Sequence, residues 1–401
     1  MATNVNELRK ISTRLGALAV FRHFLDTDVI QSLRGMIHFL GIQQEKEYCI
    51  EQYGRLCSEI FLQGGNLSQI VLDFLRYDEN PCIRSAAAGE TMSLPIRKAM
   101  EQELYTLQMV ADLTATDLIA PLVFGDGLPL WENKPINIAL EYENLLRQAP
   151  TRGYGMFAQH RAFTVSGEEL IPVRSVDEQS LDQLYGYENE RRQVLENTKA
   201  LAEGRGASNV LLYGDAGTGK SSTIKACARE LASAGVRLVE FDKTQLDQIP
   251  VITDRLHGNP LKFIFYIDDL SFGTGDDAFC MLKGILEGGI TGRPDNIVIY
   301  ATSNRRHMIR ETFEDRQGTD IHLNDSLQQN MSLAARFGLA ITFSKPEKDL
   351  YLEIVTRLAK EAAIDLPEEE LLVKAEAFAI RRNGRSPRTA RQFIQLLAIG
   401  L

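Results

Sequence analysis

The chain lacks the cysteine pattern of a disulfide-stabilised protein. It has five cysteines, an odd number, and no two of them form a C-x-x-C pair. Reduced thiols explain this composition better than a disulfide framework does. No internal repeat and no low-complexity tract is present either, so nothing in the composition indicates a repeat protein or a disordered chain.

Long apolar runs are also missing. The longest, such as Phe263 to Ile267, are far too short to span a bilayer. The stretch from Met1 to Leu8 is polar and lacks the basic-then-apolar pattern of a secretion signal. We therefore expect a cytoplasmic protein with no membrane partner.

Basic residues are not in excess. The formal net charge of the 401-residue chain is −10. This charge argues against passive binding of nucleic acid over the whole surface, although it leaves room for a local basic groove. Nucleic acid is therefore a possible but not a favoured partner.

The chain is long enough for two or three domains. Residues 1–150 have apolar spacing typical of helices and no strong strand signal, which predicts a mainly helical N-terminal domain. Residues 151–180 are predicted to be a linker, with a possible small hairpin around Ser166 and Gly167. Residues 346–401 are predicted to be helical again. Between them, residues 181–345 alternate strands with helices, which predicts a parallel sheet covered on both faces; its strands are expected at 209–213, 237–241, 262–267, 296–302 and 339–343.

The most informative motif in this α/β region is a phosphate-binding loop. Residues 214–221 fit the pattern G-x-x-x-x-G-K-[ST] in full, between a predicted strand and a predicted helix at 222–234. Glycines allow the backbone to wrap around phosphates at a helix N-terminus. Lys220 is placed to reach the outer phosphates, and the Ser221 hydroxyl is placed to bind Mg²⁺. The predicted nucleotide-binding residues are Gly214, Asp215, Ala216, Gly217, Thr218, Gly219, Lys220, Ser221 and Ser222.

Further polar residues stand where later strands end. Asp268 and Asp269 follow the apolar strand at 262–267. At the carboxyl edge of a parallel sheet they would face the ligand crevice, Asp268 to hold Mg²⁺ and Asp269 to polarise the water that attacks the γ-phosphate. Asn304, after the next strand, either contacts that water or is an ordinary turn residue.

Two arginine positions complete the set. Arg336 precedes the last strand and either reaches the nucleotide of a neighbouring subunit or lies on the surface with its stem packed on Phe337. The segment from Gly384 to Arg391 is basic at the start of the final helix, where positive charge opposes the helix dipole. A bound polyanion would explain this charge better than solvent would.

Taken in chain order, the phosphate-binding loop, the carboxylate pair, Asn304, Arg336 and the basic start of the final helix resemble the motifs of AAA+ ATPases. This resemblance covers residues 181–401. More narrowly, segments 212–222, 268–272 and 293–307 resemble an uncharacterised bacterial AAA+ group known as domain of unknown function 815. The resemblance implies a P-loop core with a five-stranded parallel sheet and a C-terminal helical lid. It also implies ATP and Mg²⁺ as ligands, and a homo-oligomer.

The resemblance assigns roles to individual residues. It implies that Gly186 and Tyr187 line the adenine pocket, that Asn304 senses the γ-phosphate, and that Arg336 acts in trans on a neighbouring subunit. Arg388 fits the lid arginine best, with Arg391 as the fallback. The implied catalytic set is Asp269, Asn304 and Arg336.

Three departures from the expected pattern bear on function. Many motors have Glu where this chain has Asp269, and the shorter side chain predicts either a water that sits closer or slow hydrolysis. Residues 243–261 contain no aromatic–apolar–Gly pore loop, which weakens a threading role. In the narrower group, an acidic residue is expected where Gly273 stands.

The favoured function is an oligomeric ATPase that remodels or assembles an unknown protein partner. One alternative is a DNA-associated ATPase resembling helicase loaders, suggested by the Asp268–Asp269 pair and by the basic patches at 305–307 and 381–382. A second is an ATP-gated scaffold with little hydrolysis, suggested by the short Asp269. A small-molecule kinase is a weaker fourth reading, because it leaves Asn304 and Arg336 without a role.

Overall fold

The computed structural model describes residues 5–41, 46–122, 127–175, 179–272, 277–287, 294–304, 335–382 and 384–400. Contacts divide the chain into two compact units, Met1–Gln159 and His160–Leu401. The segment 151–180, which the sequence suggests is a linker, is shared between these units. No helix in the described residues combines the length and the apolar character needed to cross a membrane.

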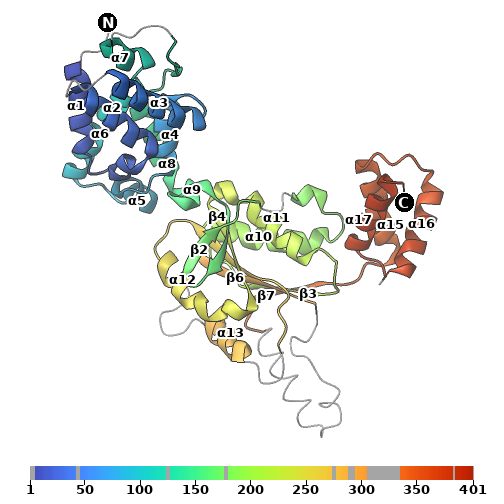
Figure 1. The fold of residues 1–401 in the computed structure, drawn as a ribbon. Helices are drawn as coiled ribbons and strands as arrows, with labels where there is room; N and C mark the ends of the chain where they lie inside the picture. Colours follow the sequence, from blue (N-terminus) through green and yellow to red (C-terminus); the bar gives the residue numbers. More distant parts are fainter. Residues whose placement is uncertain are drawn as a thin grey trace. The chain divides into compact units, whose positions relative to one another are not determined.

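In the described residues of the first unit, all regular secondary structure is helical (Figure 1). Asn66 caps α4 as its sequence position predicts, because its side chain accepts a hydrogen bond from the backbone N–H of Gln69 at 2.9 Å. The helices are α1 (Val5–Gly16), η1 (Arg22–Asp26), α2 (Asp28–Gly41), α3 (Lys46–Leu62), α4 (Leu67–Tyr77), α5 (Pro81–Ala88), α6 (Leu94–Ala111), α7 (Ala115–Ile119), η2 (Ala120–Leu122), α8 (Ile138–Arg152) and α9 (Met156–Gln159).

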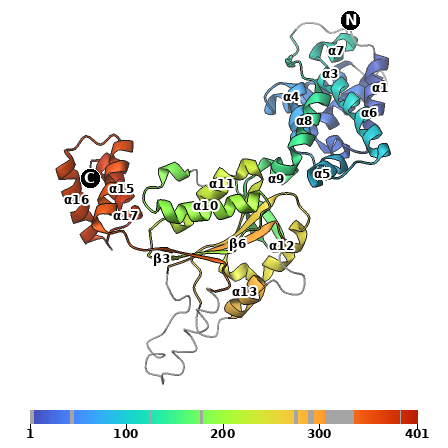
Figure 2. The ribbon, with the colours of Figure 1, turned by 180° about the vertical axis from the view of Figure 1, so that it is seen from behind.

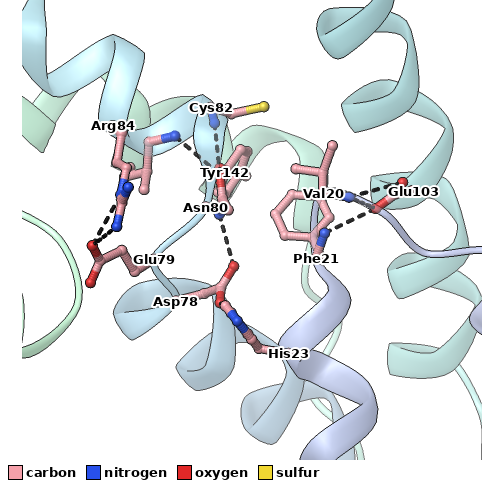
Figure 3. Close-up of polar contacts among 11 residues, drawn as sticks. Val20, Phe21, His23, Asp78, Glu79, Asn80, Cys82, Arg84, Glu103 and Tyr142 are labelled. Atoms are coloured by element: carbon pink, nitrogen blue, oxygen red, sulfur yellow. Dashed lines mark hydrogen bonds and ion pairs between the residues drawn. The ribbon is translucent and has the colours of Figure 1, made fainter.

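Buried polar side chains fix how these helices meet (Figure 3). The Asn80 side-chain oxygen accepts from the backbone N–H groups that begin α5 and from the Tyr142 hydroxyl of α8, the latter at 2.9 Å. Glu103 of α6 is 8% exposed, and its carboxylate accepts from the backbone N–H groups of Ala19, Val20 and Phe21 at 2.9 to 3.2 Å. This carboxylate therefore holds the chain that leads into η1 against α6.

Replacing Glu103 with alanine is expected to destabilise the first unit by about 3 kcal/mol, because buried N–H groups would lose a charged acceptor. Urea unfolding followed by circular dichroism measures the loss. The matched control is Glu101→Ala, on the exposed face of the same helix, which should change stability by less than about 0.5 kcal/mol. Equal stability of the two variants would contradict this role for Glu103.

The second unit is built on one mostly parallel sheet, in the order β2-β1-β4-β5-β6-β3-β7. The five predicted parallel strands are all present: β3 (Val210–Gly214), β4 (Val236–Phe241), β5 (Lys262–Ile267), β6 (Ile297–Ser303) and β7 (Leu339–Phe343). The sheet has two strands more than expected. The hairpin of β1 (Ala162–Ser166) and β2 (Glu169–Pro172) extends it, because β1 pairs in parallel with β4.

Helices cover both faces of this sheet, as predicted. Figures 1 and 2 show α10 (Glu188–Ala202) and α11 (Lys220–Glu230) on one face, and α12 (Ile249–Leu256) and α13 (Asp277–Glu287) on the other. The helix predicted at 222–234 is shorter, since α11 ends at Glu230 and the 3-10 turn η4 (Ala232–Ala234) follows it. The remaining 3-10 turns are η3 (Leu181–Gln183) and η5 (Lys243–Gln248).

The C-terminal helices form a small bundle with its own apolar core. They are α15 (Lys348–Glu361), α16 (Glu368–Arg381) and α17 (Pro387–Ala398). Ser386 caps α17 and Pro387 occupies its first turn, as the sequence predicts. This bundle is the predicted helical lid.

Candidate active site

The phosphate-binding loop joins β3 to α11 and depends on glycine geometry. Gly214, Gly217 and Gly219 have φ values of 130°, 79° and 96°, a region that L side chains rarely adopt. A Cβ on Gly214 would also lie 2.3 Å from the carbonyl oxygen of Phe343. Glycine is therefore required at these positions. The loop ends at the N-terminus of α11, where backbone N–H groups and the helix dipole favour anions.

Lys220 is the buried cation of this loop, with 5% of its surface exposed. Its ammonium donates to the carbonyl oxygens of Gly214 and Asp215 at 3.1 and 2.7 Å, and to the side-chain oxygen of Asn304 at 2.9 Å. Burial lowers the pKa of Lys220, while the carboxylates of Asp215, Asp269 and Asp268 oppose this shift. A partly desolvated ammonium of this kind interacts strongly with an anion brought beside it.

Asp268 and Ser221 bring two oxygen ligands together. The Ser221 hydroxyl donates to Asp268 Oδ1 at 2.8 Å, although the two residues belong to α11 and to the end of β5. Burial raises the pKa of Asp268, but hydrogen bonds, chiefly the one from Thr302, outweigh it and hold the pKa below its ordinary value. This carboxylate is therefore ionised at neutral pH.

These two groups fit Mg²⁺. In the described residues no three His, Cys, Asp or Glu side chains gather into a metal-binding group. Mg²⁺ does not require such a cage, because it is commonly held by one or two protein oxygens together with phosphates and water. The hydroxyl and the ionised carboxylate are a donor set of that kind.

Asp269 adopts a backbone conformation that is uncommon for a residue with a side chain. Its φ is 48°, in the left-handed region, which Asp and Asn tolerate better than most residues do. Its carboxylate accepts a hydrogen bond from the Asn304 amide at 2.7 Å. The strand order β5-β6-β3 explains this contact, because the ends of β5 and β6 lie side by side next to the loop.

Thr302 is a site residue that the sequence interpretation missed. Its hydroxyl donates to Asp268 Oδ1 at 2.6 Å and accepts from the backbone N–H of Asp269 at 3.0 Å. It therefore orients both carboxylate residues from the neighbouring strand. Its place two residues before Asn304, near the end of a buried strand, was the available signal.

The lid touches the phosphate loop directly. The backbone N–H of Arg388 donates to the carbonyl oxygen of Gly217 at 3.2 Å. A Cβ on Gly217 would lie 3.1 Å from both Ser386 Oγ and Arg388 Cβ. Asp215, at the start of the loop, accepts from the backbone N–H of Lys345 at 2.8 Å, just before the lid begins.

The remaining loop residues differ in exposure. Ala216 and Asp215 are exposed. Thr218 is buried, and its hydroxyl donates to the Asp215 carbonyl at 2.9 Å.

A cavity lies between the loop, α10 and the lid, and its lining is cationic. Among the residues that the structure describes, three arginines line it, Arg191, Arg388 and Arg391, and no carboxylate does. Its other lining residues are Gln179, Gln183, Leu184, Tyr185, Gly217, Thr218, Gly219, Ser222, Thr223, Ile354, Leu358 and Pro387. Both candidate lid arginines therefore face the same cavity, and its charge suits an anionic ligand.

Gly186 and Tyr187, expected to line the adenine pocket, are not among these lining residues. Tyr187 directly precedes α10 in the left-handed conformation, with a φ of 62°. Its ring lies 5.3 Å from that of Phe343, and its hydroxyl donates to the Ser344 carbonyl at 2.6 Å. The preceding residues Leu184 and Tyr185 line the cavity in their place.

Arg336 is not brought to the loop within this chain. Its Nε donates to Glu287 Oε1 at 2.6 Å, where α13 ends. A residue that acts on a neighbouring subunit would not need to reach its own loop. The basic patch at 305–307 and the position of Gly273 lie outside the described residues.

Three solved structures show the extent of similarity. The Holliday junction branch migration motor RuvB of Thermotoga maritima is 17% identical with a TM-score of 0.37, and the match covers 55% of this chain and 66% of RuvB, just under two thirds. The AAA domain of FIGL-1 in complex with ADP is 16% identical with a TM-score of 0.36, over 56% of this chain and 75% of that one. A structure described as the basis for katanin self-assembly is 16% identical with a TM-score of 0.37, over 56% and 71%. At such low identities and TM-scores, these similarities do not indicate a function.

The sequence comparisons point to one family. Among curated proteins, none matches the chain. The family described as "Protein of unknown function (DUF815)" matches residues 157–400, more than half of the chain. The sheet order and the loop between β3 and α11 show an AAA+ P-loop core, and by this match the chain belongs to the DUF815 family.

Proposed function

We propose that this protein binds and hydrolyses Mg-ATP as an oligomer, to remodel or assemble a protein partner. One observation supports this most: a continuous set of hydrogen bonds runs from Lys220 through Asn304 to Asp269, beside the pair of Ser221 and Asp268. A cation for the outer phosphates, a Mg²⁺ ligand pair and a carboxylate for water thus lie together. The phosphoryl-transfer reaction needs these groups.

The chain's own groups account for binding and catalysis. The loop N–H groups and Lys220 bind the phosphates, and Ser221 and Asp268 would hold Mg²⁺, which when bound neutralises charge on the phosphate oxygens. Asp269 is positioned to accept a hydrogen bond from the attacking water, and Asn304 holds the Asp269 carboxylate in place. Leu184, Tyr185 and Ile354 offer the apolar part of the cavity to the base.

The oligomer proposal rests on Arg336. Replacing it with alanine is expected to reduce ATP turnover by roughly 1000-fold, because an arginine supplied in trans neutralises charge in the transition state. ATP affinity should stay within about threefold of wild type, since such a contact forms mainly in the transition state. Phosphate release and calorimetry on the same preparation measure the two quantities.

Glu287 provides the matched control, because it forms an ion pair with Arg336 within the described part of the chain. Glu287→Gln removes the pair and leaves the arginine, so turnover should persist. If Glu287→Gln loses turnover as severely as Arg336→Ala does, the arginine has a structural role and the trans role is contradicted. Loss of ATP affinity in Arg336→Ala equal to the loss of turnover would have the same meaning.

A further inference from the structure

Arg191 is a largely buried arginine that the nucleotide motifs do not include. It lies in the first turn of α10, where its backbone N–H donates to the Tyr187 carbonyl at 2.9 Å. Its side chain is only 11% exposed, yet it lines the cavity beside the phosphate loop. Its ion-pair contact among the described residues is with Glu188, at 3.4 Å, and the Glu188 side chain is 62% exposed.

The surroundings of Arg191 compensate poorly for the burial of its positive charge. A guanidinium carries five N–H donors in a fixed fork, and burying such a charge is unfavourable unless those donors are satisfied. Burial lowers the pKa of Arg191, and the nearby carboxylates of Glu188 and Glu190 oppose this shift only in part. Within the described part of the chain, no hydrogen bond from the Arg191 side chain is found.

Two other arginines of this unit show the contrast. Arg237 is also buried, 4% exposed, but its Nη1 donates to the carbonyls of Ala232 and Val236 at 2.9 and 3.0 Å. Arg192, the neighbour of Arg191 on α10, is exposed and donates to the Asn189 side chain at 3.2 Å. Arg191 is therefore largely buried, though less so than Arg237, and it has none of the backbone acceptors that Arg237 has.

We infer that Arg191 binds an inner phosphate of the nucleotide from the core side of the cavity. This inference rests on the proposed function and adds to it a residue outside the phosphate loop and the lid. The cavity that Arg191 lines includes Gly219, Ser222 and Thr223 but not Asp268, Asp269 or Asn304. The arginine thus faces the first turn of α11, away from the carboxylates where the outer phosphate is cleaved.

A contact to an inner phosphate predicts equal effects on two ligands. Arg191→Met keeps the apolar stem and removes the charge, and it should weaken binding of both ADP and Mg-ATP by about 30-fold, the range of one charge-assisted bidentate contact. Arg191→Lys keeps the charge without the fork, and should weaken both by about fivefold. Calorimetry on the full-length chain measures all of these affinities.

Arg192→Met is the matched control on the same helix, and its affinities should lie within about twofold of wild type. A second readout separates binding from structure. Thermal unfolding of nucleotide-free Arg191→Met should occur at or above the wild-type temperature, because removing a poorly compensated buried charge does not destabilise the chain. A purely structural arginine would instead lower that temperature and leave the affinities unchanged.

The outcomes are distinct. If wild type binds ADP and Arg191→Met binds it as tightly as Arg192→Met does, the role of Arg191 is overturned while the proposed function stands. Weakening of Mg-ATP alone would contradict the inner-phosphate contact. If Arg191→Met fails to fold, the Arg191→Lys variant tests the inference in its place. Unchanged affinities of Arg191→Lys for ADP and Mg-ATP would overturn the bidentate contact between the guanidinium and the phosphate. A wild-type chain that binds neither nucleotide would remove both the inference and the proposed function.

Discussion

Replacing Lys220 with methionine is expected to weaken ATP binding by roughly 100-fold or more, the largest effect on affinity that we expect in this protein. Lys220 is 5% exposed, and in the described chain its ammonium donates to two loop carbonyls and to Asn304. Methionine has a similar length but brings no charge to the phosphates. Calorimetric titration with Mg-ATP, beside wild type, measures the effect.

Lys225 provides the control for this substitution. It lies on the same helix as Lys220, and its ammonium is 3.8 Å from Glu240. Lys225→Met should therefore bind Mg-ATP within about threefold of wild type. Thermal unfolding of both variants checks that they are folded. A Lys220→Met chain that is folded and binds ATP normally would show that the loop does not hold the phosphates through this residue.

Asp269→Asn is expected to have the largest effect on turnover, a reduction of about 1000-fold, because an amide cannot take the proton of the attacking water. Asparagine is the suitable replacement, since it tolerates the φ of 48° that position 269 requires. ATP affinity should change by less than about threefold, as the side chain is not a phosphate ligand. Phosphate release under saturating Mg-ATP provides the measurement.

Asp268→Asn separates the two carboxylates. Asp268 is paired with Ser221 and Thr302, so its loss should raise the Mg²⁺ concentration needed for ATP binding as well as lower turnover. Asp269→Asn should leave the Mg²⁺ requirement unchanged. If wild type has no turnover that Asp269→Asn can reduce, an ATP-gated scaffold becomes the better account of the site.

Much of the core and its site could be predicted from the sequence. The strands at 262–267 and 339–343 have the bounds that their apolar runs predict. The approach of Asp268, Asp269 and Asn304 to the loop follows from one rule, that parallel strands end at the same edge of a sheet. The contact between Asn304 and Asp269 is therefore a consequence of the strand order, which the structure shows and the sequence alone did not predict.

Other features depend on distant contacts that no local pattern contains. The hairpin was visible as two short strands, but its place in the sheet depends on β1 pairing with β4, more than 60 residues later. Tyr187 was expected to line the adenine pocket; its backbone is left-handed, its ring lies beside Phe343, and it is not among the residues that line the cavity. Arg191 resembles any helical arginine in the sequence, and only its burial beside the loop distinguishes it from Arg192.

The claim beneath all of these proposals is that the loop from Gly214 to Ser221 holds the phosphates of Mg-ATP. Isothermal titration of the purified full-length chain with Mg-ATP tests it most directly. We expect saturable binding of one nucleotide per chain, lost in Lys220→Met and kept in Asp269→Asn. A folded wild-type chain with no measurable affinity for Mg-ATP would contradict the account.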